Sequence, residues 1–330
     1  MKKMFLSLVA AMLCATAMYA QSSMLATLSH NGKISTYYGA SALSDAYKAA
    51  DNGDIITLSS GSFNAVNLEK AVTIRGAGMA IDSTAQTEPT ILMGDFNINI
   101  PDSIDSRLTL EGLYHNLTIT ITSDFKNGTF LKDRFNKIKY SNRNTIKNLT
   151  MIHCKVSDQI TIYNNSSVSC VNCYINDPTA NSAGNYEFVN CIIFKTDCTE
   201  NSIGKSSFKN SILYSNNGSA LSSSAVAYNC VGIGLSGMFK YIPNTTNSTK
   251  SFQEVFKTYT GTYNDNENFE LTDDAKSTLK GIDGTQIGIY GGNMPFSTTP
   301  TNPQITKCNV AAKSTADGKL SVDITVNGAE

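Results

Sequence analysis

A short phrase that begins with Asn recurs five times between residues 148 and 232, and it limits the possible folds more than any other feature. Each copy has an Asn, then a small or apolar residue, then a short run of strand-forming residues. The Asn-to-Asn steps are 24, 18, 20 and 19 residues. A period of about 20 residues with β-forming content is typical of a solenoid, in which each repeat forms one coil stacked on the last. The five positions are Asn148, Asn172, Asn190, Asn210 and Asn229.

The repeat predicts structural roles for the Asn residues and for the residues that follow them. We expect each Asn to lie at a turn, with its side-chain amide bonded to its neighbours in the coils above and below. Cys173, Cys191 and Cys230 directly follow three of the Asn residues. Because a free thiol behaves as a small hydrophobe, we predict that these three are stacked in the core.

The remaining cysteines favour neither a disulfide framework nor a metal site. Without Cys14, which belongs to the leader described below, seven cysteines remain. An odd number in an exported protein argues against a complete set of disulfides. Cys170 and Cys173 have CxxC spacing, but no second such pair or nearby pair of His accompanies them. We therefore predict no metal site.

The beginning of the chain predicts export and a capped solenoid. Residues 1–20 have two Lys and then an apolar run, which is typical of a secretory signal peptide. A lead-in segment follows at 21–40. Ser41 is the expected N-cap of a helix whose apolar face covers the open end of the first coil. That face comprises Leu43, Ala46, Tyr47 and Ala50.

Two stretches resemble a known superfamily. Ala49-Ala50-Asp51-Asn52-Gly53-Asp54-Ile55-Ile56-Thr57-Leu58 and Val72-Thr73-Ile74-Arg75-Gly76-Ala77-Gly78 resemble the first coils of pectate-lyase-like right-handed parallel β-helix proteins. Thr285-Gln286-Ile287-Gly288-Ile289-Tyr290-Gly291-Gly292, followed by Pro295-Phe296, is similar to the closing phrase of secreted bacterial β-helix proteins. The resemblance implies an all-β, right-handed parallel β-helix over residues 41–293 with an N-terminal capping helix. It implies little about activity, because this fold includes lyases, hydrolases and adhesins.

The composition changes after Gly292. Pro295, Pro300 and Pro303 stand among Ser and Thr, so we expect an extended linker at 294–303. In the appendage at 304–330, an Asp317-Gly318 turn and alternating apolar residues predict a β-hairpin. Two strands alone are rarely stable, so the hairpin should pack on the β-helix, pair with another chain or begin a sandwich module. The alternating residues are Leu320, Val322, Ile324 and Val326.

The charged residues do not indicate a catalytic site. A β-helix lyase needs clustered acids to hold calcium and a Lys or Arg as base, and calcium is expected only in that case. No acidic position recurs with the coil period. The best grouping is Asp95, Asp102, Asp105, Arg107 and Glu111. An inverting hydrolase needs several Asp on adjacent coils, but the only Asp-Asp pair, Asp273-Asp274, lies beyond the last Asn phrase. We assign no catalytic residue and expect solvated loop charges.

A local basic patch accompanies a break in the period. The step of 32 residues from Asn116 to Asn148 leaves room for a protruding loop or a partial coil at 123–144. Apart from Asp124 and Asp133, its charged residues are basic. They are Lys126, Lys132, Arg134, Lys137, Lys139 and Arg143.

Charge, hydropathy and aromatic content narrow the function. With 26 Lys and Arg against 27 Asp and Glu, the chain has no net charge that would favour nucleic acid. No apolar run after the leader reaches the roughly 20 residues of a transmembrane helix. Tyr and Phe recur near the Asn phrases, where they can stack in the coil or form a platform for a glycan.

We predict an exported surface or periplasmic binding protein of a Gram-negative bacterium, adhesin-like or glycan-interacting. Its expected partner is a polysaccharide or a cell-surface glycan. The alternatives are a lyase or glycoside hydrolase acting on acidic glycans, and a purely structural rod. The expected functional regions are the segment 123–144 and the tail after Gly292.

Overall fold

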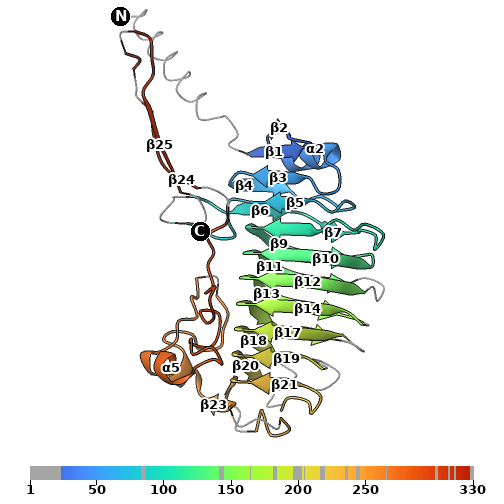
Figure 1. The fold of residues 1–330 in the computed structure, drawn as a ribbon, viewed down its shortest axis with the longest axis vertical. Coiled ribbons are helices and arrows are strands. Elements are labelled where there is room, and N and C mark those ends of the chain that lie inside the picture. Colours follow the sequence, from blue (N-terminus) through green and yellow to red (C-terminus); the bar gives the residue numbers. More distant parts are fainter. Residues whose placement is uncertain are drawn as a thin grey trace, which may run out of the picture.

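The computed structural model shows a parallel β-solenoid built from two long sheets, A and B (Figure 1). This confirms the predicted all-β solenoid fold. The signal peptide predicted at 1–20 lies outside the described residues. These are residues 24–82, 87–140, 145–163, 165–180, 184–195, 203, 205–215, 220–234, 237–242, 246–264, 266–301, 304–310, 313–315 and 317–327.

Sheet A has 11 strands, which are parallel except for the antiparallel contacts of β1 with β2 and with β3. In spatial order they are β2 (Lys33–Tyr38), β1 (Leu25–His30), β3 (Ile55–Leu58), β5 (Thr73–Arg75), β8 (Leu108–Glu111), β10 (Phe125–Leu131), β12 (Ile146–Ile152), β14 (Ser167–Val171), β17 (Asn185–Val189), β19 (Ser207–Lys209) and β21 (Val226–Tyr228).

Sheet B has 12 strands, all parallel, and each coil passes from a strand of sheet A to a strand of sheet B. From the first coil onward they are β4 (Gly61–Asn64), β6 (Thr90–Met93), β9 (Leu113–Ile121), β11 (Arg134–Tyr140), β13 (Lys155–Ile162), β15 (Tyr174–Asn176), β18 (Ile192–Lys195), β20 (Ile212–Ser215), β22 (Val231–Ile233) and β23 (Ser248–Lys250), with β7 (Phe96–Ile98) beside β9 and β16 (Pro178–Ala180) beside β13.

The N-terminal cap is helix α2 (Ala42–Ala49), and its predicted apolar face is buried as expected. Ser41 is not a side-chain cap: its backbone is helical and its hydroxyl makes no capping hydrogen bond. The helix is instead tied to the first coil by Tyr47, whose hydroxyl accepts hydrogen bonds from the N–H groups of Glu69 (2.6 Å) and Lys70 (2.8 Å).

A row of left-handed residues, which we call the turn row, links sheet A to sheet B. Asn adopts this conformation at lower cost than most other L-residues, which explains why it recurs here. Asn148 is not part of the row, because it lies inside β12, and His153 takes the position that the repeat assigned to it. The described members are Gly112, Lys132, His153, Asn172, Asn190, Asn210 and Asn229, with φ between 50° and 66°.

The next residue in each coil points into the core and forms a ladder across coils. The Cys154 N–H donates to Cys173 Sγ (3.3 Å), and the Cys173 N–H donates to Cys191 Sγ (3.5 Å). The same position is held by Ser211 further along and by Asp133 one coil earlier, where Asp133 Oδ1 accepts the Leu113 N–H at 2.8 Å. Cys173, Cys191 and Cys230 are buried and free, which confirms the predicted core thiols.

Thiol burial predicts that the protein loses stability at alkaline pH. Burial raises the pKa of Cys230 to about 12, from an ordinary value of 9.0. The folded state therefore holds this proton more tightly than the unfolded chain. Its contribution is complete below about pH 9 and is lost as the pH rises toward 12. We expect the free energy of unfolding, measured with denaturant at pH 8, 10 and 11, to fall with pH.

Cys230→Ser is the matched variant, because Ser211 already holds the same ladder position. It should show a shallower fall with pH than the wild type. Identical pH dependence for the two proteins would contradict a buried, protonated thiol at this position.

Aromatic rings also stack inside the coils. Tyr186 and Phe188 have ring centroids 5.2 Å apart, and Phe188 and Phe208 are likewise 5.2 Å apart. All three are buried, so these rings belong to the core. Tyr228, in the next coil, is 49% exposed.

The chain turns back after β23. Helices α4 (Phe252–Val255) and α5 (Asp273–Thr278) belong to a segment, 251–279, that covers the outer face of sheet B at its C-terminal coils (Figure 1). This packing forms a second apolar core. Its sheet members include Tyr174, Ile192, Ile212 and Val231, and its covering members include Val255, Phe256, Tyr259, Phe269 and Leu271.

Residues 280–301, which we call the strap, then run along the turn row toward the N-terminal coils. Asn229 Nδ2 donates to the Lys280 carbonyl (3.2 Å), and Asn210 Oδ1 accepts the Ile282 N–H (3.0 Å). Asn172 Nδ2 donates to the carbonyls of Ile289 (2.8 Å) and Gly291 (2.7 Å).

The predicted amide-to-amide ladder is therefore wrong for Asn172, Asn210 and Asn229, whose side chains bind the strap. The Asn190 side chain packs directly against Gly292 of the strap. A Cβ added at Gly292 would lie 2.5 Å from Asn190 Nδ2. Only Asn148 approaches a neighbouring amide, that of Asn127 at 3.5 Å.

The Pro-containing stretch that was predicted as a linker also lies against the solenoid. His153 Nε2 is 3.0 Å from the Met294 carbonyl, and Lys132 Nζ donates to the Thr299 carbonyl at 2.6 Å. The Thr301 N–H donates to Glu111 Oε1 at 2.8 Å. The strap thus reaches the coil that contains β8.

The tail forms the predicted hairpin. Strands β24 (Gln304–Val310) and β25 (Val322–Asn327) pair antiparallel, and the hairpin extends from the end of the strap past the N-terminal coils (Figure 1). No helix in the described part of the chain is long and apolar enough to span a membrane.

Candidate functional site

The structure does not gather the predicted acidic group. Asp95 and Asp102 are exposed in separate turns, before β7 and before β8. Asp105 pairs with Lys126 at 3.0 Å, on the sheet A side. Arg107 donates to Thr129 Oγ1 at 2.9 Å.

Glu111 is the one buried member of the group, and its contacts are structural. Its Oε2 lies 3.2 Å from Arg75 Nε, and its Oε1 accepts from the strap. No three His, Cys, Asp or Glu side chains among the described residues are grouped as metal ligands would be. Of the four acids, Asp105 thus pairs with Lys126 of β10 and Glu111 holds the strap.

Of the two structures expected at 123–144, the protruding loop is wrong over 125–140. These residues form the regular strands β10 and β11 and thus an additional coil, as the other alternative expected. The step from Asn116 to Asn148 misled the prediction, because Asn116 lies on sheet B and Asn148 on sheet A. The basic residues separate accordingly: Lys126 lies on sheet A, Lys132 in the turn row, and Arg134, Lys137 and Lys139 on β11. Arg143 lies outside the described residues.

One row of residues on the outer face of sheet B changes from polar to apolar along the solenoid. The strand register places its members side by side, as Tyr114, Arg134, Lys155, Tyr174, Ile192, Ile212 and Val231. The apolar members lie under the segment 251–279. Lys155 marks the edge of this cover, where its Nζ donates to the Glu267 carbonyl at 3.2 Å. Tyr114 and Arg134 lie beyond it and are partly exposed.

A cleft of about 380 Å³ lies where the cover ends. We call it the sheet B cleft. Its residues come from three neighbouring strands and from the covering segment. They are Tyr114 and Asn116 of β9, Arg134 and Asn136 of β11, Ser157 of β13, and Tyr263.

The cleft side chains are held by one another and by the cover. The Arg134 guanidinium carbon lies 4.2 Å from the centroid of the Tyr114 ring, and Nη2 is 3.5 Å from the Tyr114 hydroxyl. Ser157 Oγ donates to Asn136 Oδ1 at 3.1 Å. On the opposite wall, the Tyr263 ring packs on Tyr174 with centroids 5.0 Å apart. The cleft is therefore preorganised.

The lining consists of groups that form hydrogen bonds and ring contacts with polar ligands. It offers two phenol rings, two carboxamides, a hydroxyl and a guanidinium, and no Asp, Glu, His, Cys or Lys of the described residues lines it. Guanidinium and amide groups bond well to hydroxyl and carboxylate oxygens. Tyr and Arg can transfer a proton in other sites, but no carboxylate of the described residues lines the cleft beside them.

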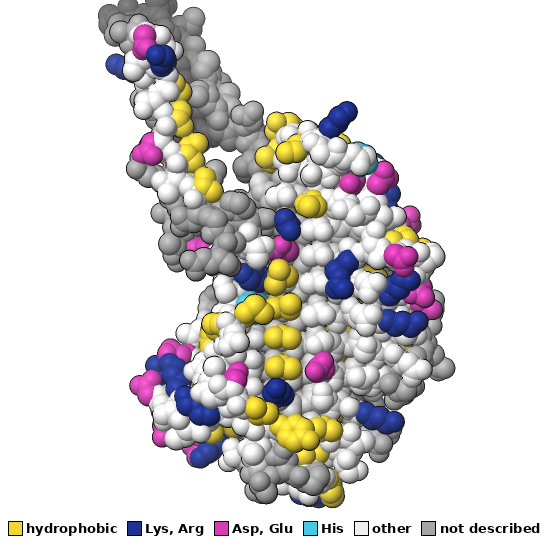
Figure 2. Space-filling model, viewed as in Figure 1, with side chains coloured by type: hydrophobic (Ala, Val, Ile, Leu, Met, Phe, Trp, Pro, Cys, Tyr) yellow, Lys and Arg dark blue, Asp and Glu magenta, His cyan; other side chains and the backbone are white. Residues whose placement is uncertain are grey.

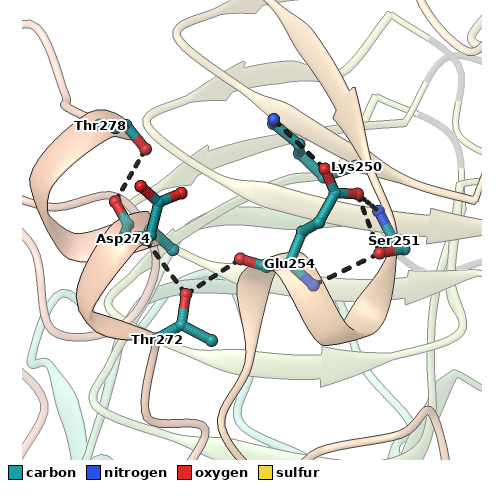
Figure 3. Close-up of polar contacts among 7 residues, drawn as sticks. Lys250, Ser251, Glu254, Thr272, Asp274 and Thr278 are labelled. Atoms are coloured by element: carbon teal, nitrogen blue, oxygen red, sulfur yellow. Dashed lines mark hydrogen bonds and ion pairs between the residues drawn. The ribbon is translucent and has the colours of Figure 1, made fainter.

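A second pocket, of about 350 Å³, lies at the exit of the solenoid between the last coils and α5. The polar groups around it serve the two helices (Figure 3). Ser251 caps α4 in a capping box with Glu254. Thr272 Oγ1 donates to the Glu254 carbonyl (3.0 Å), and Thr278 Oγ1 donates to the Asp274 carbonyl (2.8 Å). Of these residues, Asp274 and Thr278 line the pocket, and their contact lies within α5.

Among the cleft residues, the sequence indicated Arg134 as part of the basic patch and Tyr114 as one of the aromatic residues that could form a glycan platform. Tyr114 and Arg134 are neighbours in adjacent strands of sheet B. Their alignment could not be predicted when the coils were counted from Asn148. Tyr263 could not be placed, because its position depends on how the segment 251–279 folds back. No family model, curated protein or solved structure matches the chain.

Proposed function

We propose that the protein is an exported glycan-binding protein and that the sheet B cleft holds the sugar. The observation that carries the proposal is the pairing of Tyr114 and Tyr263 with Arg134, Asn116 and Asn136 in one cleft. Export rests on the leader at 1–20, and membership of the pectate-lyase-like superfamily rests on the sequence resemblance.

The chemistry of the cleft matches that of a sugar ring. A pyranose has apolar C–H faces and a rim of hydroxyl groups, so it needs aromatic surfaces together with amide and hydroxyl partners. Tyr combines a ring face with a polar tip, and Asn both donates and accepts. The cleft volume lies within the roughly 300–1,000 Å³ of small-molecule sites. We favour a binding protein over a lyase or hydrolase, because no carboxylate of the described residues lines the cleft.

Arg134→Ala is expected to weaken glycan binding by about 10- to 100-fold, since a hydrogen bond to a charged group contributes about 1.5–3 kcal/mol. The glycan is first identified by retention of the purified protein on acidic and neutral polysaccharides, with and without calcium. Affinity is then measured by calorimetry for Arg134→Ala and Tyr114→Ala.

Lys139→Ala is the matched control, because Lys139 is exposed on the same strand outside the cleft. Unchanged affinity in both cleft variants would place the glycan elsewhere. Release of unsaturated products, seen as ultraviolet absorbance, would overturn a purely binding role.

A further inference from the structure

Two apolar surfaces face the same side of the molecule, the first exposed and the second partly exposed (Figure 2). The first, which we call the hairpin face, runs along the tail and comprises Leu320, Val322, Ile324 and Val326, each 50–53% exposed. The second, which we call the sheet A column, crosses the outer face of sheet A. It comprises Leu131, Ile152, Val171 and Val189.

The sheet A column is continuous because its members are direct neighbours in the parallel register. Leu131 lies beside Ile152, Ile152 beside Val171, and Val171 beside Val189. With strands about 4.8 Å apart, the column is about 14 Å long. The hairpin face spans six residue steps and is about 20 Å long. Both surfaces are apolar, and the hairpin face is long enough to cover the whole column.

The strap fixes where the hairpin leaves the solenoid. Thr301 is bonded to Glu111, and Glu111 lies directly beside Leu131, the first member of the sheet A column. From this point the hairpin extends toward the N-terminal end, whereas the column extends toward the C-terminal end (Figure 1). The hairpin therefore does not cover the column of its own chain.

We infer that two copies of the chain associate about a two-fold axis at the level of β8, with each hairpin face packed on the sheet A column of the other copy. A rotation by 180° about an axis perpendicular to the solenoid reverses the partner. Its sheet A column then lies alongside the first hairpin, and its hairpin lies alongside the first column. One operation satisfies both contacts and closes the assembly, as an isologous interface requires.

The same arrangement explains the isolated hairpin. A two-stranded sheet with one apolar face is marginally stable until that face is covered. The column limits each contact to about 14 Å by 10 Å. Two such contacts, counted on both copies, bury about 560 Å² in total, below the range of permanent dimers. We therefore expect a reversible dimer whose population changes with protein concentration.

Sedimentation velocity of the chain without its leader, from about 1 to 100 µM, tests this, since weak interfaces of this size dissociate in that range. The wild type should shift from monomer to dimer across the series. Ile324→Asp and Val171→Asp should each raise the dissociation constant at least tenfold, because each places a charge in the apolar contact.

Two variants serve as controls: Thr325→Asp, on the adjacent position of β25, and Lys139→Asp, on sheet B. Both should dimerise as the wild type does. Circular dichroism of each variant separates loss of association from loss of folding. A wild type that stays monomeric throughout, or a dimer unaffected by Ile324→Asp, would overturn the inference.

A cross-linking experiment tests the pairing directly. Ile324→Cys and Val171→Cys are made in separate chains whose Cys198 and Cys308 are replaced by Ser. Mixed under mild oxidation, the two should form a disulfide between chains. Cross-linking of the Ile324→Cys chain only with itself would show a hairpin-to-hairpin contact and would contradict docking on sheet A.

Discussion

Replacing Phe188 with alanine is expected to lower the free energy of unfolding by about 3–5 kcal/mol, the usual cost of removing a buried phenyl ring. Phe188 is fully buried in the middle of the solenoid, where it stacks on Phe208 with an angle of 13° between the ring planes. Neighbouring rings cannot fill the space without leaving their own stacks, so a cavity should remain. Chemical denaturation followed by circular dichroism measures the loss.

The position of Phe188 should also affect cooperativity. A solenoid is stabilised by contacts between adjacent coils, so a weak central coil should separate the unfolding of the two ends. We expect a broader or two-step transition in the variant. Tyr228→Ala is the control, because Tyr228 is half exposed on β21, and it should cost less than about 1 kcal/mol. Equal losses in the two variants would contradict the assignment of Phe188 to the core.

Asn172→Ala should have the second-largest effect and should loosen the strap. The change leaves the carbonyls of Ile289 and Gly291 without the Asn172 amide, and each unsatisfied buried group costs about 1–3 kcal/mol. The left-handed backbone at residue 172 adds about 1 kcal/mol when its side chain is Ala. Hydrogen exchange should speed up across 282–301 while the coil amides stay protected.

Asn172→Gly separates these two costs, because Gly keeps the backbone conformation but lacks the amide. It should loosen the strap as Asn172→Ala does and should lose less overall stability. Asn148→Ala, at an exposed left-handed position away from the strap, should lose the same backbone contribution of about 1 kcal/mol but leave the exchange of the strap unchanged. Unchanged exchange of the strap in both Asn172 variants would show that its other contacts suffice.

The sequence predicted what depends on local pattern and missed what depends on contacts between distant segments. The recurring Asn indicated the solenoid, the apolar spacing around Leu43 indicated the cap, and the alternation from Leu320 to Val326 indicated the hairpin. The ladder of side chains was predicted one residue too early in each coil. It is formed by Cys173, Cys191 and their equivalents, and not by the Asn residues before them. The Asn amides instead meet the strap, whose docking cannot be seen in a repeat pattern.

The cleft was hidden for the same reason. Its inner wall depends on the strand register that puts Arg134 beside Tyr114, and its outer wall depends on Tyr263 of the returning segment. Asn148 lies inside β12, before the true repeat position at His153. Counting coils from Asn148 therefore placed the coil boundaries at the wrong residues. A register drawn from His153 and Asn172 would have aligned the two cleft residues.

The strap has a consequence for the order in which the molecule can be completed. Coils of a solenoid can form one after another as the chain emerges, because each needs only the coil before it. The bond between Glu111 and Thr301 joins residues 190 positions apart, so it can form only after nearly the whole chain is available. The early coils thus remain free to fray until the last segment arrives, and its docking then couples both ends of the stack into one cooperative unit.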